Sequence, residues 1–272
     1  MSKDVVEYYQ GYREEDRLTT NNARRLEFVT TTRIFDELFG KKLKILDCAA
    51  GTGVYAFYLA DRGHEVTATD ITPRHIEVIR ATLQEKSYDM QTAVLDATDM
   101  SMFEDEAFDV VLNMGPFYHL TEADQREKCM SECLRVLKKG GLLVTAYIPR
   151  FYVFQYVAMS DGKYLDAKLA ERLIQTGVLK HEDEMCFWTD AYYATKREME
   201  QMYQEHGVEI VDHFAQDGLA PSFSGKVDRW DEQQFKTWCD YHYSICRETS
   251  ILGASNHVIV VGRKSGTFGI DE

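Results

Sequence analysis

Short apolar runs alternate with amphipathic segments through the middle of the chain. The runs expected to form strands are residues 43–48, 65–69, 91–95, 108–112 and 142–148, with two more at 208–214 and 257–261. Apolar positions recur with helical spacing at residues 54–61, 73–84, 122–137 and 196–205, and a further helix is expected at 231–247. Residues 138–141, KKGG, indicate the end of the third helix. Strands alternating with helices predict an α/β, doubly wound sheet covered on both faces.

The segments outside this alternation have a different pattern of apolar and polar residues. Residues 1–42 are expected to form a helical N-terminal cap on a single domain spanning 1–272, whose cofactor-binding core is 43–149. Two insertions follow at 150–195 and 216–255, and the first is rich in aromatic residues. We expect both insertions to form a lid over a substrate pocket. The alternative is a second apolar layer that completes the core.

Composition narrows the classes of partner. The 272 residues contain 45 acidic and 31 basic side chains, giving a net charge of −14, which disfavours a nucleic-acid substrate. The chain starts without an apolar signal core and contains no run of 18 apolar residues, so we expect a cytoplasmic protein away from the membrane. Six scattered cysteines are read as reduced thiols, and no metal site is expected. The oligomeric state stays open.

Residues 45–53, ILDCAAGTG, have the pattern of a nucleotide-type cofactor loop. An apolar strand ends at Asp47, small residues follow at Ala49, Gly51 and Gly53, and a helix opens at Val54. Small residues let the backbone approach a ligand closely. The loop alone fits either a nicotinamide or an S-adenosylmethionine site.

Polar residues at the neighbouring strand ends narrow this choice. Asp70, Asp96 and Asn113 each stand at or just past the carboxyl end of an expected strand, the edge where parallel sheets bind ligands. Asp70 lies where an acidic residue for ribose hydroxyls is expected. A pyrophosphate is disfavoured beside a carboxylate such as Asp47, whereas a cationic methionine ammonium is favoured there. The pattern therefore favours S-adenosylmethionine.

With these motifs, the chain resembles a class I S-adenosylmethionine-dependent methyltransferase. ILDCAAGTG, ATDIT, LDATDM and FDVVLNMGPFYHL resemble the first four motifs of the family, and LRVLKKGGLLV resembles the strand that follows. The resemblance implies a Rossmann-like seven-stranded sheet with an antiparallel last strand. More narrowly, the whole chain resembles a bacterial group of small-molecule methyltransferases carrying GPxYHL and a SILGASNH-like end, a resemblance that names no acceptor.

The resemblance also implies roles for single residues. Asp47 and the Gly51–Gly53 backbone are expected to flank the methionine end of the cofactor, Asp70 to bind the ribose, and Ile71 to pack on adenine. Asp96 is expected to accept from the adenine amino group beside the Ala97 N–H, and Asn113 to help hold the methionine ammonium. Ala49 is a departure, because the family usually has glycine there, and its methyl group is tolerated if φ stays negative.

His119 and Tyr118 follow the fourth strand, where substrates of such enzymes lie. We expect both to bind the substrate, and His119 is also the candidate general base. The alternative for His119 is a half-buried side chain satisfied by a backbone carbonyl. The expected function is methyl transfer from S-adenosylmethionine to an O, N or S atom of a small molecule, with S-adenosylhomocysteine as product. The alternatives are S-adenosylmethionine binding without turnover and a nicotinamide-dependent oxidoreductase.

Overall fold

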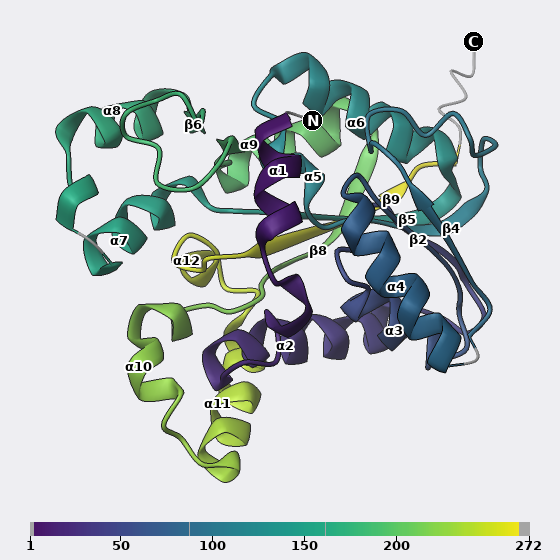
Figure 1. Cartoon of the computed structure of the whole chain (residues 1–272), viewed down its shortest axis with the longest axis horizontal. Coiled ribbons are helices and arrows are strands. Elements are labelled where there is room, and N and C mark those ends of the chain that lie inside the picture. The colour runs from purple at the N-terminus through teal and green to yellow at the C-terminus, as the bar shows by residue number, and fades with distance from the viewer. Residues whose placement is uncertain (1–2, 87, 161, 267–272) are drawn as a thin grey trace.

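A seven-stranded sheet forms the centre of the protein (Figure 1). The computed structural model describes residues 3–86, 88–160 and 162–266. The sheet has the order β3-β2-β1-β4-β5-β9-β8. Its strands are β1 (Lys44–Asp47), β2 (Glu65–Asp70), β3 (Met90–Val94), β4 (Phe108–Asn113), β5 (Leu137–Tyr147), β8 (Val208–Ala215) and β9 (Val258–Lys264). Because β9 pairs antiparallel with both β5 and β8 while the other pairs are parallel, the expected Rossmann-like α/β fold is confirmed.

Helices cover both faces of the sheet. One face packs against α2 (Asn22–Leu38), α3 (Val54–Ala60) and α4 (Pro73–Glu85). The other packs against α6 (Ala123–Val136) and α9 (Lys196–Glu205). On β4 the alternation is direct, because Val110 and Leu112 enter the first cluster while Val111 enters the second.

The remaining helices belong to the N-terminal cap, the loop after β4 and the insertions. They are α1 (Lys3–Gly11), α5 (Pro116–His119), α7 (Arg150–Ser160), α8 (Ala167–Gln175), α10 (Ser224–Val227), α11 (Glu232–Ile245) and α12 (Thr249–Leu252), with short 3₁₀ turns at Glu14–Asp16, Gly162–Tyr164 and Ala220–Phe223. A two-stranded ribbon joins β6 (Val178–Leu179) and β7 (Ala191–Tyr192). No helix within the described residues is long and apolar enough to cross a bilayer.

α6 ends at Val136, one residue before its expected end, but the next strand begins at once instead of at residue 142. β5 begins at Leu137 and includes the KKGG segment, and Leu137 pairs with Phe108 before the register shifts toward Val110. Gly140 takes a φ of +75°, and a Cβ on Gly141 would lie 2.8 Å from the Asp109 carbonyl oxygen. The two glycines therefore serve a bulge in the sheet rather than a helix end.

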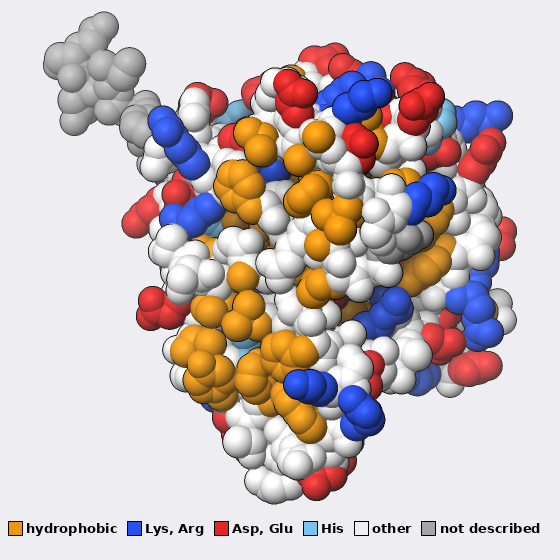
Figure 2. All heavy atoms as spheres, turned by 90° about the vertical axis from the view of Figure 1, so that its left-hand side faces the viewer, with side chains coloured by type: hydrophobic (Ala, Val, Ile, Leu, Met, Phe, Trp, Pro, Cys, Tyr) orange, Lys and Arg blue, Asp and Glu red, His pale blue; other side chains and the backbone are white. Residues whose placement is uncertain are grey.

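The first insertion builds its own small core beside the sheet. Val153, Val157, Leu169 and Leu179 are buried together in it, with other apolar residues from α7, α8 and the ribbon. Figure 2 shows further apolar side chains exposed on the side of the molecule that carries this insertion. Tyr156 is 45% exposed and also lines the cavity described below, so α7 borders its opening.

Candidate functional site

A cavity of about 700 Å³ opens at the carboxyl edge of the sheet. The loops after β1, β2, β4 and β5 form its floor, and α1, α2 and both insertions form its walls. Ligands of doubly wound sheets bind at this edge. The volume lies within the usual range for small-molecule sites, about 300–1,000 Å³. Residues of both insertions line this cavity, and the first insertion also packs its own core.

The loop after β1 forms an open cradle of backbone. Gly51 and Gly53 adopt φ values of +54° and +90°, which favour glycine. A Cβ on Gly115 would lie 3.2 Å from the Cβ of Ala49, so the two loops approach each other closely. Within the described part of the chain, the only positive-φ residues other than glycine are Lys42 and Glu106, and the Ala49 methyl is therefore tolerated.

Two buried carboxylates make the floor of the cavity negative. Asp70 accepts from the Gly51 N–H at 2.9 Å and the Thr72 N–H at 2.8 Å, which ties the ends of β1 and β2 together. Asp47 is 2% exposed. Burial and the neighbouring Asp70 charge raise the pKa of Asp47 to about 7. A cationic ligand would favour the ionised form of Asp47, which fits an ammonium group.

The structure brings most of the expected site residues to one cavity. Those that line it are Asp47, Ala49, Gly51, Asp70, Ile71, Ala97, Tyr118 and His119. Gly53, Asp96 and Asn113 do not. Asp96 instead accepts from the Thr98 N–H and hydroxyl, both at 2.9 Å. Asn113 is fully buried, and its amide nitrogen lies 3.6 Å from Cys129 Sγ.

His119 lies on the cavity wall with both ring nitrogens engaged. Nδ1 lies 3.0 Å from the Asp190 carbonyl oxygen, and Nε2 lies 3.0 Å from the Tyr9 hydroxyl. Because a carbonyl only accepts, the partners assign the hydrogen to Nδ1 and let Nε2 accept from Tyr9. Burial lowers the pKa of His119 to about 4, so the ring is neutral at neutral pH.

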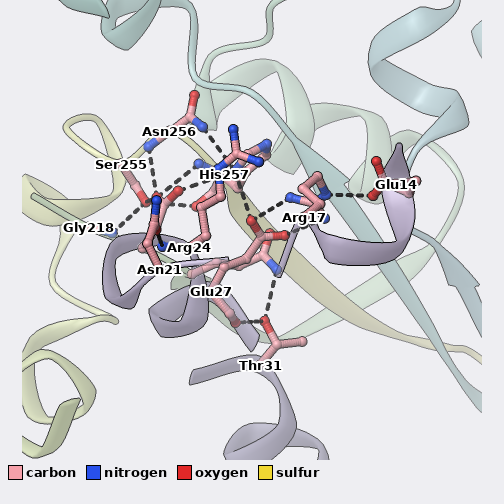
Figure 3. A network of polar contacts seen from close by, with 12 residues as sticks. Glu14, Arg17, Asn21, Arg24, Glu27, Thr31, Gly218, Ser255, Asn256 and His257 are labelled. Atoms are coloured by element: carbon pink, nitrogen blue, oxygen red, sulfur yellow. Dashed lines mark hydrogen bonds and ion pairs between the residues drawn. The ribbon is translucent and has the colours of Figure 1, made fainter. Parts of the chain in front are cut away.

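A second polar cluster lines the same cavity. Arg17 donates to Glu14 at 2.6 Å and to both carboxylate oxygens of Glu27 at 2.8 and 2.9 Å (Figure 3). His257 Nδ1 lies 3.2 Å from Asp217 Oδ2 and 3.5 Å from Glu27 Oε2. These residues come from the cap, the end of β8 and the start of β9, and no local pattern connects them.

The Glu27–Asp217–His257 grouping is compact enough to suggest a metal site. Their ligand atoms lie within 4.8 Å of one another. However, the Arg17 guanidinium already neutralises Glu27. One Asp217 oxygen also accepts from the Ser255 hydroxyl and the Asn256 and His257 N–H groups. The cluster is therefore a protein-satisfied ion-pair network rather than a set of vacant ligands.

Aromatic side chains form the wall between the two polar ends. Tyr8 packs edge-on against Trp188 at 6.4 Å between ring centroids, and Trp188 lies 4.9 Å from His119. The cap thus contacts the first insertion across the cavity, and the Thr189 hydroxyl bonds to Asp4. The lining aromatic residues are Tyr8, Tyr9, Tyr12, Tyr55, Tyr118, Tyr152, Tyr156, Phe187, Trp188 and Tyr193.

Comparison with known proteins agrees with this geometry. Residues 45–141 match the methyltransferase domain family. The chain is 34% identical over 139 residues to a demethylmenaquinone methyltransferase of Clavibacter sepedonicus, covering 51% of this chain and 54% of that protein. It is 29% identical over 143 residues to a ubiquinone biosynthesis O-methyltransferase of Chelativorans sp., covering 53% and 55%. The chain therefore spans about half the length of these curated relatives.

A solved structure gives the same fold over a longer span. The 1,6-didemethyltoxoflavin-N1-methyltransferase of Burkholderia thailandensis, with bound S-adenosylhomocysteine, superposes with a TM-score of 0.57 at 14% identity, covering 96% of this chain and 85% of that one. Residues 45–141 therefore match a methyltransferase domain, and most of the chain shares the fold of an S-adenosylmethionine-dependent methyltransferase. The cofactor of this class is S-adenosylmethionine, and the cradle with its two carboxylates fits it.

Proposed function

We propose that this protein transfers a methyl group from S-adenosylmethionine to a small-molecule acceptor. The observation that carries the proposal is a single cavity. It joins the glycine cradle and the Asp47–Asp70 pair to an aromatic wall closed by the cap and both insertions. Such a cavity holds a cationic cofactor at one end and leaves a water-poor space for an acceptor at the other.

The residues that hold the cofactor follow from their contacts. Asp70 accepts from the ribose hydroxyls with the lone pairs that Gly51 and Thr72 leave open, and Ile71 packs on the adenine. Asp47 faces the methionine ammonium. Glu14 is added to this set, because a Cβ built on Gly51 would lie 3.3 Å from Glu14 Cγ. When bound, the cofactor supplies an activated methyl group on a sulfonium.

Asn113 and Asp96 are given supporting roles in this proposal. Asn113 contacts Cys129 under the cradle, and it acts by holding the end of β4 in place. Asp96 bonds to the Thr98 backbone, and this turn presents Ala97 to the cavity. The adenine edge then binds beside Ala97, and the Asp96 carboxylate holds the loop in place.

His119 is proposed to bind the acceptor together with Tyr118. Its Nε2 faces the Tyr9 hydroxyl rather than an open space, and its low pKa makes it a weak base. Burial raises the pKa of Tyr9 well above its ordinary value, so Tyr9 remains a neutral donor. The two side chains form a fixed, uncharged corner beside the cofactor.

Equilibrium binding tests the cofactor assignment. Isothermal titration calorimetry should show binding of S-adenosylmethionine and S-adenosylhomocysteine, and no comparable binding of NAD(H) or NADP(H). Tight nicotinamide binding without S-adenosylmethionine binding would replace the proposal with the oxidoreductase alternative. The charge-neutral variant Asp70→Asn should lose affinity, whereas Asp99→Asn, on an exposed loop outside the cavity, should not.

Turnover separates an enzyme from a cofactor-binding protein. Purified protein is incubated with methyl-labelled S-adenosylmethionine and panels of phenols, amines, thiols and carboxylic acids, and labelled product is extracted. Methyl transfer that depends on both protein and acceptor supports the proposal. Cofactor binding without transfer to any panel member would favour the non-catalytic alternative.

A further inference from the structure

We propose that His257, oriented by Asp217, is the general base that removes a proton from a hydroxyl group of the methyl acceptor. The inference rests on the proposed function and extends it from methyl transfer in general to O-methylation. We assign the reacting hydroxyl to an acceptor with a planar ring, because such a ring can stack on the aromatic side chains of the cavity wall.

The first support is the orientation of the imidazole ring. Asp217 Oδ2 lies 3.2 Å from His257 Nδ1, and a carboxylate only accepts, so Nδ1 carries a hydrogen. Among the described residues, the polar contacts of the His257 ring all involve Nδ1, which donates to Asp217; the Asn256 amide nitrogen, itself a donor, lies 3.1 Å from Nδ1 without a hydrogen bond to it. Nε2 is therefore left for a ligand in the cavity that His257 lines. A base held by a carboxylate with its other nitrogen toward the substrate is the arrangement of general-base dyads.

The second support is the charge around the ring. The charged groups that face His257 are Glu27 from α2, Asp217 after β8, and Arg17 from the cap. Burial would lower the pKa of His257, but the two carboxylates outweigh burial and raise it above its ordinary value. The imidazolium that forms on proton transfer is thereby stabilised. The hydrogen bonds of the His119 ring run to a backbone carbonyl and a tyrosine hydroxyl rather than to a carboxylate, so His119 is the weaker base of the two.

The third support is an unsatisfied hydroxyl close by. Tyr152 of α7 is 1% exposed and lines the same cavity, yet its hydroxyl has no hydrogen-bond partner within the described residues. Burial is the main cause that raises the pKa of Tyr152, and the Asp217 charge adds to it. A buried polar group without a partner is costly, so a ligand atom is expected to satisfy it. An acceptor oxygen held in this cavity can do so.

The fourth support is the path from the base to the cofactor cradle. Glu14 lies against Gly51, Arg17 joins Glu14 to Glu27, and Glu27 faces His257 (Figure 3). This unbroken chain of contacts fixes the base relative to the methyl donor. A base serves an acceptor that must lose a proton, as a hydroxyl must, whereas a neutral amine needs none. Among acceptors that lose a proton, the unpartnered Tyr152 hydroxyl favours oxygen over sulfur, which is a weak hydrogen-bond acceptor.

The reaction step balances in atoms and charge. The acceptor hydroxyl gives its proton to Nε2, and its oxygen forms the new bond to the methyl carbon. The carbon–sulfur bond breaks, and its electron pair goes to sulfur, which becomes a neutral thioether. The positive charge of the sulfonium is replaced by that of the imidazolium, which afterwards returns its proton to water.

The test uses 4-nitrophenol as a probe, because its phenolate has a visible absorption band. Full-length protein saturated with S-adenosylhomocysteine is titrated with the probe at a pH where free 4-nitrophenol is mainly neutral. Wild-type protein should increase the phenolate band on binding. His257→Gln should abolish this increase, and Asp217→Asn should reduce it. The matched control His206→Gln, outside the cavity, should retain it.

A second readout is turnover with any hydroxyl acceptor found in the panels. His257→Gln should lower kcat by about 10²–10⁴-fold, the usual contribution of a general base, with little change in affinity for S-adenosylhomocysteine. Asp217→Asn should shift the acidic limb of the pH–rate profile. Circular dichroism and calorimetry confirm that each variant is folded and binds the cofactor product.

Several outcomes would overturn the inference. The first is that His257→Gln ionises the probe as much as wild-type protein does. The second is that wild-type protein with S-adenosylhomocysteine bound does not ionise it. The third is that the acceptor proves to be an amine. In each of these cases the proposed methyltransferase function still stands. Failure of wild-type protein to bind S-adenosylhomocysteine would instead overturn the proposed function, and the inference with it.

Discussion

The binding of S-adenosylmethionine should release a proton, because Asp47 is half-protonated near neutral pH in the free protein. Its pKa is raised to about 7 by burial and by Asp70. A methionine ammonium beside Asp47 favours the ionised form, so the bound protein holds the carboxylate without its proton. Affinity should therefore fall as the pH drops through 7.

The magnitude follows from the fraction of ionised Asp47. With a pKa of about 7, this fraction is about 0.09 at pH 6 and about 0.76 at pH 7.5. If only the ionised form binds, the dissociation constant is about eightfold higher at pH 6, and about 0.9 proton is released there per ligand bound. Calorimetry in buffers with different ionisation enthalpies measures this proton directly.

The control is Asp47→Asn, which keeps the shape of the side chain and cannot titrate. The amino group of the ligand titrates near pH 8 and contributes equally to both proteins, so the difference between them isolates Asp47. Proton release near zero at pH 6 in wild type, or an equal pH dependence in the variant, would refute the assignment of Asp47 to the ammonium.

Three further predictions concern the same cavity. Asp70→Asn should weaken S-adenosylhomocysteine binding by about 10–100-fold in calorimetry, because hydrogen bonds to a charged group contribute about 1.5–3 kcal/mol; unchanged affinity would argue against ribose binding. Asp47→Asn should raise the melting temperature of the ligand-free protein at pH 8, because a carboxyl pKa raised on folding lowers stability as the pH rises from about 4 to about 7. Arg17→Met should lower the free energy of unfolding in urea by about 3–5 kcal/mol, because it leaves Glu27 buried without its partner. The exposed Arg13→Met should change it by less than about 1 kcal/mol, and equal losses would contradict the distinction between the two ion pairs.

The sheet and its cofactor loop could be predicted because their signals are local. Each strand is a short apolar run with a polar residue at its carboxyl end, as in Ile45–Asp47 and Glu65–Asp70. The helix ends at Val136, close to its expected end, but the strand expected from 142 already begins at Leu137, because a bulge opposite Phe108 uses the glycines of 138–141. Glycine permits both geometries, and only pairing with the neighbouring strand decides between them.

The side-chain directions and the acceptor end could not be predicted in this way. Asn113 stands at a strand end, as predicted, but its side chain enters the layer under the sheet. Glu27 and His257 are 230 positions apart in sequence and meet only because α2 crosses the ends of β8 and β9. The spacing of charged residues along the sequence carries no information on such a contact, because the contact depends on tertiary packing alone.

The two ends of the cavity differ in charge, and this difference determines which end binds the cofactor and which end binds the acceptor. At the cofactor end, Asp47 has no cationic partner within the described residues, and its raised pKa records the cost of ionising it alone. At the other end, Glu27 is paired with Arg17, and Asp217 accepts a hydrogen bond from His257, which becomes its counterion only when protonated. A sulfonium cofactor therefore gains most beside Asp47, whereas the other end accepts a neutral molecule whose proton His257 can take. As the methyl group transfers, positive charge leaves the cofactor end, and the network around His257 is built to hold it as an imidazolium.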